Sequence, residues 1–258
     1  MSGGPGSGID WDVHAPMYTI MSDLEADATE LQVGVIPLLS TDTVLDIGCG
    51  PGRVTIPVAR RVARVTALDS FPLMLDACRR RAAEAGADNI DFVALDWHDA
   101  RPGVNLDRHD VVICSRTAAL GDIERVSEFA TRIAAVITWA NAPSIPPILD
   151  RLFADTGTEE LSASGRPDRS QGYKQLFGTA YDLGYEPNVA VVPDGFTRTY
   201  PDREHVYDHL RPLRPIPPGR DAERAFRANI DAFTVENPDG TVTFEVTTRS
   251  VVLWWQVG

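Results

Sequence analysis

The residues best placed to do chemistry lie in a short glycine-rich stretch. Asp46 ends an apolar run and is followed by Gly48, Gly50 and Gly52 in a G-x-G-x-G pattern. Glycines let the backbone turn sharply and let a ligand lie against the main chain. The helix expected from about Arg53 would present unpaired N–H groups to a carboxylate or phosphate. This stretch therefore predicts a strand, a tight ligand-binding loop and a helix.

The spacing of the glycines narrows the choice of ligand. A dinucleotide-binding loop has the pattern G-x-G-x-x-G, with its third glycine inside the start of the helix. Arg53 occupies that position here, and Asp46 stands where a dinucleotide fold usually keeps an apolar strand residue. A carboxylate suits a cationic ligand better than a pyrophosphate. A nicotinamide-dependent oxidoreductase is therefore disfavoured.

A second carboxylate, Asp69, ends the next apolar run at 64–68 and follows Gly50 by about 20 residues. In nucleotide-binding α/β units a carboxylate at this distance accepts hydrogen bonds from ribose hydroxyls. The other interpretation of Asp69 is a helix N-cap. We expect a ribose contact, because the spacing fits it.

Together these residues give the stretch a resemblance to a known family. An acidic residue followed by G-x-G-x-G after the first strand resembles the hallmark of the class I S-adenosylmethionine-dependent methyltransferases. The resemblance covers residues 42–141 well and the remainder only by the order of its elements. It implies S-adenosyl-L-methionine as cofactor and S-adenosyl-L-homocysteine as product. The cofactor-binding residues that it implies are Asp46, Gly48, Cys49, Gly50, Gly52, Asp69, Ser70, Asp96, Trp97, Ser115 and Arg116.

Two later strand ends carry the rest of the expected site. Asp96 follows a strand at 90–95, and the resemblance implies that it contacts the adenine amino group while Trp97 supplies a backbone N–H. Stacking of Trp97 on adenine and plain core packing both stay open. Ser115 and Arg116 follow the fourth strand, at the edge where open α/β sheets bind ligands. Arg116 would hold the methionine carboxylate or an anionic group of the substrate, or else form a surface salt bridge.

No catalytic residue is assigned from the sequence. The reaction implied by the resemblance is an in-line displacement at the sulfonium methyl group, which requires mainly alignment of the partners. A general base is needed only when the acceptor carries a proton that must leave. The weak candidates for that role are His98, His14 and Tyr18.

The three cysteines, Cys49, Cys78 and Cys114, lie far apart and have no histidine nearby at ligand spacing. Neither a metal site nor a disulfide is therefore expected.

Composition limits the partners. A chain of 258 residues, 43% of them hydrophobic, suits one large domain or a domain with a cap. The net charge of −13 disfavours nucleic acid, which usually needs a basic surface. No apolar run is long enough to cross a membrane, so we expect no membrane partner and a cytoplasmic location. A small-molecule methyl acceptor fits better, and the sequence does not indicate an oligomeric state.

The alternation of strands and helices predicts an α/β fold with a doubly wound sheet. The resemblance implies a seven-stranded, mostly parallel, Rossmann-like sheet in which the last strand inserts antiparallel between the fifth and sixth. We expect a flexible lead at 1–8, followed by one domain at 9–258. Within it, helices at 9–40 would lie over the pocket, and a helical cap at 201–233 would sit between the last two strands.

Several finer expectations accompany this fold. Asp122 should cap a helix that runs through residue 133, with a strand at 134–138 and Asn141 just beyond it, on the acceptor side. A polar loop is expected at 155–168, and a small hairpin joins 234–236 with 242–244. In the cap, Arg211, Arg214 and Arg220 would suit an anionic substrate or form a solvated face.

The function expected from these observations is S-adenosylmethionine-dependent methyl transfer to a small molecule. The alternative is a cofactor-binding or regulatory protein on the same fold that transfers nothing.

Overall fold

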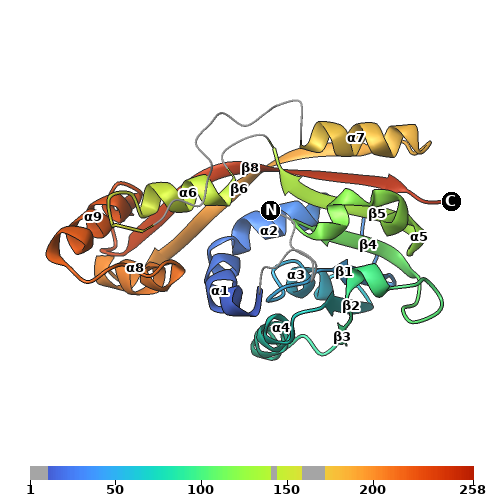
Figure 1. Cartoon of the computed structure of the whole chain (residues 1–258), viewed down its shortest axis with the longest axis horizontal. Coiled ribbons are helices and arrows are strands. Elements are labelled where there is room, and N and C mark those ends of the chain that lie inside the picture. The colour runs from blue at the N-terminus through green and yellow to red at the C-terminus, as the bar shows by residue number, and fades with distance from the viewer. Residues whose placement is uncertain (1–10, 141–143, 159–171) are drawn as a thin grey trace.

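An eight-stranded sheet runs through the part of the chain that the computed structural model describes, residues 11–140, 144–158 and 172–258 (Figure 1). Seven strands follow the order β3-β2-β1-β4-β5-β8-β6, and the short β7 pairs with β8. β8 is antiparallel to both β5 and β6, whereas the pairs from β3 to β5 are parallel. The expected sheet, with an antiparallel strand inserted between the fifth and sixth, is confirmed. The strands are β1 (Thr43–Ile47), β2 (Arg64–Asp69), β3 (Ile90–Ala94), β4 (His109–Ser115), β5 (Ala130–Trp139), β6 (Asn188–Tyr200), β7 (Thr234–Glu236) and β8 (Val242–Gln256).

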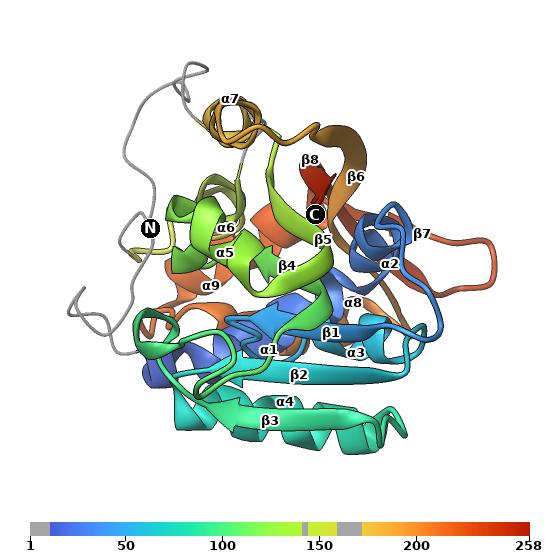
Figure 2. The same cartoon turned by 90° about the vertical axis from the view of Figure 1, so that its right-hand side faces the viewer.

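Helices cover both faces of the sheet (Figure 2). Residues of α2 and α3 share an apolar cluster with Val44 of β1, and α4 packs on β2 and β3. On the opposite face, α5 and α7 share a cluster with Leu45, because successive residues of a strand point to opposite faces. The helices are η1 (Trp11–His14), α1 (Ala15–Leu24), α2 (Ala26–Gly34), α3 (Thr55–Ala59), α4 (Pro72–Glu84), η2 (Trp97–Asp99), η3 (Ala118–Gly121), α5 (Ile123–Glu128), α6 (Ile145–Leu152), α7 (Tyr173–Asp182), α8 (Arg203–Leu210), η4 (Arg211–Leu213) and α9 (Arg220–Asp231).

The central strands are buried on both faces. Val111, Val112, Ile113 and Cys114 of β4 have no exposed surface. A continuous apolar run of this kind is typical of a parallel strand covered by helices on both sides. In β4 the polar residues are therefore confined to the two ends of the strand, where the loops begin.

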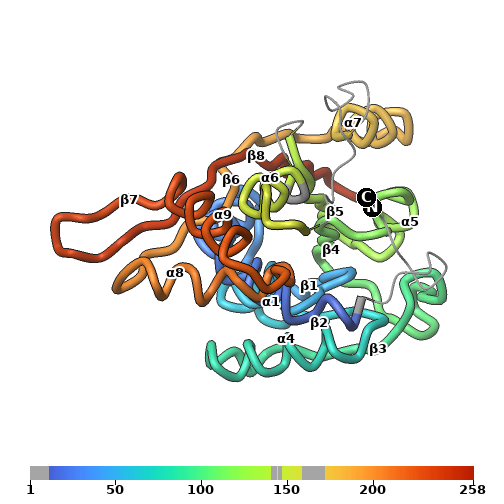
Figure 3. Tube along the Cα trace, turned by 60° about the vertical axis from the view of Figure 1, so that its left-hand side comes forward, coloured from blue at the N-terminus to red at the C-terminus, as the bar shows by residue number. Residues whose placement is uncertain are grey.

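Residues 201–233, for which the sequence predicts a helical cap, contain α8, η4 and α9, and we call this segment the cap. It is carried by β6 and β8, which pair from Asn188↔Trp254 to Tyr200↔Val242 and extend past the other strands (Figures 1 and 3). Its apolar core includes Phe226, Ile230 and Leu210, and it also takes in Met21 and Leu24 of α1 together with residues of α6. The cap therefore packs on the N-terminal helices.

Three expected boundaries differ from those of the structure. Asp122 does cap α5, but that helix ends at Glu128, and β5 begins at Ala130 instead of residue 134. Ile133 pairs with Val111 of β4 on one side and with Gln256 of β8 on the other, so sheet pairing overrides the helical spacing here. The helix after the glycine loop also begins later than expected, at Thr55.

Other expectations are confirmed or lie outside the described residues. β7 pairs with β8 through Thr234↔Phe244, which confirms the hairpin. The lead at 1–8, Asn141 and most of the polar loop at 155–168 fall outside the described residues. Within the described ranges, no helix is long and apolar enough to cross a bilayer.

We expect Phe226→Ala to lower the free energy of unfolding of the whole chain by about 3–5 kcal/mol, since the ring is fully buried and a large cavity would replace it. Because the cap core includes Met21 and Leu24, urea denaturation followed by far-UV circular dichroism and tryptophan fluorescence should show one shifted transition. Leu73→Ala is the control: residue 73 is 52% exposed, so this substitution should change the free energy of unfolding little. Two separate transitions would show that the cap folds independently.

Candidate functional site

The glycine loop has the backbone shape that its sequence predicts. Gly48, Gly50 and Gly52 all have positive φ, at 69°, 53° and 87°. A Cβ atom would lie 2.6 Å from the Thr117 hydroxyl at Gly48 and 2.8 Å from the Cys78 sulfur at Gly52, so these two glycines are required by packing. A Cβ at Gly50 would meet nothing within 4 Å. Gly50 therefore has open space beside it, where a ligand can approach the main chain.

Asp69, at the end of β2, is tied to this loop. Its carboxylate accepts hydrogen bonds from the backbone N–H of Gly50 at 2.9 Å and of Phe71 at 3.0 Å. Burial raises the pKa of Asp69, and these two N–H donors act in the opposite direction. The residue expected to bind ribose thus also holds the middle of the loop in place. Ser70 follows it directly and is half-buried.

Asp46 is buried inside the site. It is 1% exposed and accepts a hydrogen bond from the Thr55 hydroxyl at 2.6 Å. Burial raises its pKa from 3.8 to about 6, although the Thr55 hydrogen bond and the Arg53 charge lower it. A cationic group brought to Asp46 would therefore gain an interaction with a carboxylate that water does not screen.

At the end of β3, the side chain of Trp97 lies in the core. The residue is 7% exposed, its ring is 5.2 Å from the ring of Phe129, and the guanidinium of Arg125 lies over the ring at 4.7 Å. Stacking of this indole on adenine is therefore wrong, and the core-packing interpretation is confirmed. Asp96 is partly exposed and accepts a hydrogen bond from the backbone N–H of His98 at 2.9 Å. The adenine contacts of Asp96 and of the Trp97 backbone stay predictions.

Arg116, directly after β4, has a side chain that is only 11% exposed, so a surface salt bridge is wrong. It pairs with Glu25 at 2.7 Å and with Asp194 of β6, and it donates to the Ser250 hydroxyl at 3.1 Å. Its guanidinium also lies 4.9 Å from the ring centre of Trp139. Burial alone would lower the pKa of Arg116, but Glu25 and Asp194 raise it above its ordinary value. Any ligand that reached Arg116 would share it with two carboxylates.

Glu25 and Arg53 complete this group, and sequence reasoning did not identify either as a site residue. Glu25 lies between α1 and α2, is 1% exposed, and reaches Arg53 at 3.4 Å with its second oxygen. Arg53 also donates to Ser115 at 2.5 Å. Burial and the Arg116 charge lower the pKa of Arg53 to about 10, which leaves it protonated at neutral pH. We call Glu25, Arg53, Arg116 and Asp194 the buried ionic cluster; its formal charges sum to zero.

Buried N–H donors surround the cluster without an acceptor. Among the described residues, Arg116 Nε, Gln32 Nε2 and Trp139 Nε1 are buried and make no hydrogen bond. Gln32 uses its oxygen to accept from Arg53 at 2.7 Å. Buried donors without partners are rare in native proteins because each costs free energy. An additional acceptor oxygen, as a ligand would bring, fits this donor set.

The candidate bases differ in their surroundings. Tyr18 is partly buried near the cluster, and burial, with a smaller contribution from Glu25, raises its pKa to about 12. Its phenol is therefore neutral at physiological pH. His98 is exposed and bonded to Asp96 at 3.0 Å, and His14 is also exposed. None of the three has the geometry that would assign a catalytic role.

Of the three cap arginines named from the sequence, Arg211 and Arg214 have acidic partners within the protein, whereas Arg220 is exposed. Arg211 pairs with Glu223 at 2.7 Å, and the buried Arg214 pairs with Asp150 of α6 at 3.0 Å. A solvated face is therefore wrong for Arg214. These pairs neutralise both cations within the protein.

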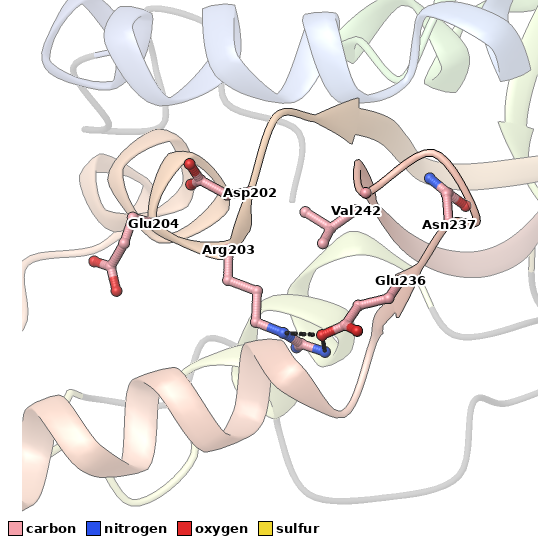
Figure 4. A pocket seen from close by; sticks show the side chains of 7 residues that line it. Asp202, Arg203, Glu204, Glu236, Asn237 and Val242 are labelled. Carbon is pink, nitrogen blue, oxygen red and sulfur yellow. Dashed lines mark hydrogen bonds and ion pairs between the residues drawn. The ribbon is translucent and has the colours of Figure 1, made fainter.

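Two surface pockets lie away from the glycine loop. One, of about 460 Å³, lies at the start of α8 beside the β7–β8 hairpin, and Arg203 crosses it to Glu236 at 3.3 Å (Figure 4). The other, of about 380 Å³, is lined by Thr66, Asp91 and His109 near the amino ends of their strands. Neither contains a residue of the buried ionic cluster.

Residues 44–138 match a family model described as a methyltransferase domain. The chain is 34% identical over 109 residues to a trans-aconitate 2-methyltransferase from Streptomyces avermitilis, which covers 38% of each protein. It is 30% identical over 141 residues to an aklanonic acid methyltransferase from Streptomyces sp. strain C5, covering 49% of this chain and 63% of the relative.

A solved structure shares the fold. An S-adenosylmethionine-dependent methyltransferase from Thiobacillus denitrificans, in complex with S-adenosyl-L-homocysteine, superposes with a TM-score of 0.52 at 14% identity, over 92% of this chain and 96% of that one. The chain therefore contains a methyltransferase domain of the class I, S-adenosylmethionine-dependent type. The matched stretch spans less than two thirds of the two curated relatives, so the similarity establishes the domain and leaves the acceptor undefined.

We expect Gly50→Ala to separate folding from binding. The new methyl group meets no protein atom within 4 Å, so its cost is the left-handed backbone, about 1–2 kcal/mol. The affinity for S-adenosylhomocysteine, measured by calorimetry, should fall at least tenfold, because the methyl group fills the space beside the loop. Gly48→Ala is the matched comparison and should lose more stability, since its methyl group collides with Thr117. Unchanged affinity in Gly50→Ala would place the ligand elsewhere.

We expect Asp46 to make stability depend on pH. Because its pKa is raised from 3.8 to about 6 in the folded protein, its favourable contribution is complete below pH 3.8 and is lost as the pH rises to about 6. The loss corresponds to about 3 kcal/mol at 1.36 kcal/mol per pKa unit. Asp46→Asn keeps an acceptor for Thr55 and removes this loss. The free energy of unfolding of the variant, measured by urea denaturation, should therefore rise relative to that of the natural protein between pH 4 and pH 6. A difference in the free energy of unfolding that stays constant with pH would contradict the raised pKa of Asp46.

Proposed function

We propose that this protein transfers a methyl group from S-adenosylmethionine to a small-molecule acceptor. The observation that carries the proposal is the geometry of the glycine loop within a methyltransferase domain. Gly50 offers open space beside a backbone of positive φ, and Asp69 holds that backbone from the end of the next strand. This is the arrangement that a nucleoside with ribose hydroxyls would use.

The residues around the loop fit the cofactor. Asp69 would accept from the ribose hydroxyls, and Asp46 provides a carboxylate for the cationic end of the molecule. Asp96 and the Trp97 backbone would contact the base, and Cys49, Ser70 and Ser115 follow strand ends at the same edge of the sheet. When bound, S-adenosylmethionine supplies an electrophilic methyl group on a sulfonium.

The chain's own contribution is binding, orientation and exclusion of water. Positioning alone can supply roughly 7–11 kcal/mol of barrier reduction in favourable cases. The N-terminal helix α1 contacts η4 of the cap, so both elements can shield the reacting groups from solvent. We assign no general base, since Tyr18 holds its proton and both histidine candidates are exposed.

A small acceptor is favoured over a nucleic acid by charge. The chain carries a net charge of −13, and Arg211 and Arg214 of the cap are neutralised by internal partners. A phosphate backbone would find no basic stripe there. Two of the curated relatives have names that refer to trans-aconitate and aklanonic acid, which supports a small organic acceptor for this chain, whereas others are named as 23S rRNA methyltransferases over shorter matches.

The first test is calorimetric titration with S-adenosylmethionine and S-adenosylhomocysteine, with NAD as the control. We expect both adenosyl ligands to bind in the micromolar range and NAD not to bind. Release of S-adenosylhomocysteine is then measured with a panel of small carboxylic acids and phenols, and with total RNA as a separate arm. Turnover with RNA alone would overturn the acceptor class. Binding without turnover on any acceptor would support a non-catalytic cofactor-binding protein, and no binding would overturn the cofactor.

A further inference from the structure

Glu25 occupies a position that a free amino-acid carboxylate would fit. One of its oxygens accepts from Arg116 at 2.7 Å, and the other faces Arg53 at 3.4 Å. Arg53 comes directly after the glycine loop, and Arg116 comes directly after β4. The glutamate thus bridges two arginines at the edge of the sheet where the methionine end of the cofactor would lie.

The bridge leaves the surrounding donors incompletely used. Arg116 Nε and Gln32 Nε2 are buried next to this bridge without an acceptor, although Gln32 is itself bonded to Arg53. A carboxylate can accept about four hydrogen bonds through its two oxygens. Glu25, which comes from the α1–α2 junction, leaves both of these donors without an acceptor. A second carboxylate at the same two arginines would bring further acceptor oxygens to them.

We propose that Arg53 and Arg116 form the carboxylate site for the amino-acid end of the cofactor, and that Glu25 occupies it as an internal stand-in when no cofactor is bound. This inference rests on the proposed function. Exchange of one carboxylate for another keeps the cluster neutral, because Asp194 stays in place. Two largely buried arginines would otherwise lose a counter-ion, which is strongly unfavourable.

The exchange makes the N-terminal helices part of cofactor binding. Glu25 is the last residue of the α1–α2 junction before α2, so its release frees the junction from Arg53 and Arg116. Thr29 and Gln32 of α2 also bond to Arg53, at 2.9 and 2.7 Å, and these contacts do not involve Glu25. α2 therefore has contacts that remain, while the junction changes its partner.

The test compares two ligands that differ in the amino-acid group. S-adenosylhomocysteine has the carboxylate, and 5′-methylthioadenosine has the same nucleoside and lacks it. Affinities for both are measured by calorimetry in the natural protein, in Glu25→Gln and in Arg53→Gln. Asp23→Asn is the matched control, since Asp23 lies on the same segment and pairs with Arg81, outside the cluster.

We expect Glu25→Gln to bind S-adenosylhomocysteine about tenfold more tightly, since a competing charge is removed, and to bind 5′-methylthioadenosine unchanged. Arg53→Gln should bind S-adenosylhomocysteine at least tenfold more weakly and 5′-methylthioadenosine unchanged. Asp23→Asn should change neither affinity. Thermal melting provides a second readout: Glu25→Gln should melt lower than the natural protein, and S-adenosylhomocysteine should raise its melting temperature by more. If Glu25→Gln does not fold, Arg53→Gln tests the same site.

Three results would overturn the inference. Weaker binding of S-adenosylhomocysteine alone in Glu25→Gln would mean that Glu25 contacts the cofactor's ammonium group. An equal change for both ligands would mean that the cluster is only structural. An unchanged ratio of the two affinities in Arg53→Gln would place the carboxylate elsewhere. In all three cases the natural protein still binds both ligands, whereas failure of the proposed function would appear as binding of neither.

Discussion

Neutral pairing of buried charge is the constraint on which this edge of the molecule depends. Taking a carboxylate or a guanidinium out of water costs several kcal/mol per ion, so buried charges must be matched and hydrogen-bonded. The four members of the buried ionic cluster come from the α1–α2 junction, the glycine loop, the end of β4 and β6. Their charges balance only when all four segments are in place. The position of the loop is thus linked to helices that precede it and to a strand that follows it by more than 130 residues.

The glycine loop could be predicted from the sequence because the residues that define it lie close together in the chain. Asp46 and the three glycines lie within seven residues, and Asp69 follows at a spacing set by one helix and one strand. The contact from Asp69 to Gly50 has the short separation that such patterns encode. The Glu25 to Arg116 pair spans 91 residues, and Glu25 is one of 37 acidic residues with no distinguishing neighbour. Only the fold identifies it as buried.

Other differences arise where tertiary contacts outweigh local pattern. The run at 129–133 satisfies helical spacing, yet Ile133 finds partners on two strands, so the segment joins the sheet. Trp97 sits at a strand end where either a ligand or the core could take its ring. The ring packs in the core against Phe129, which follows α5. This contact joins residues 32 positions apart, so it cannot be inferred from the local sequence. The strand order, by contrast, followed from the family resemblance that the glycine loop carries.

The helix α1 has two roles, and they couple the cap to the loop. Met21 and Leu24 pack in the cap core, while Glu25, the next residue, pairs with the arginines at the glycine loop. A helix transmits displacement along its length because its backbone hydrogen bonds hold it rigid. A shift of the cap that repacked Leu24 would therefore move Glu25 relative to Arg53 and Arg116. The packing of the cap and the ion pairs at the glycine loop are therefore coupled through α1.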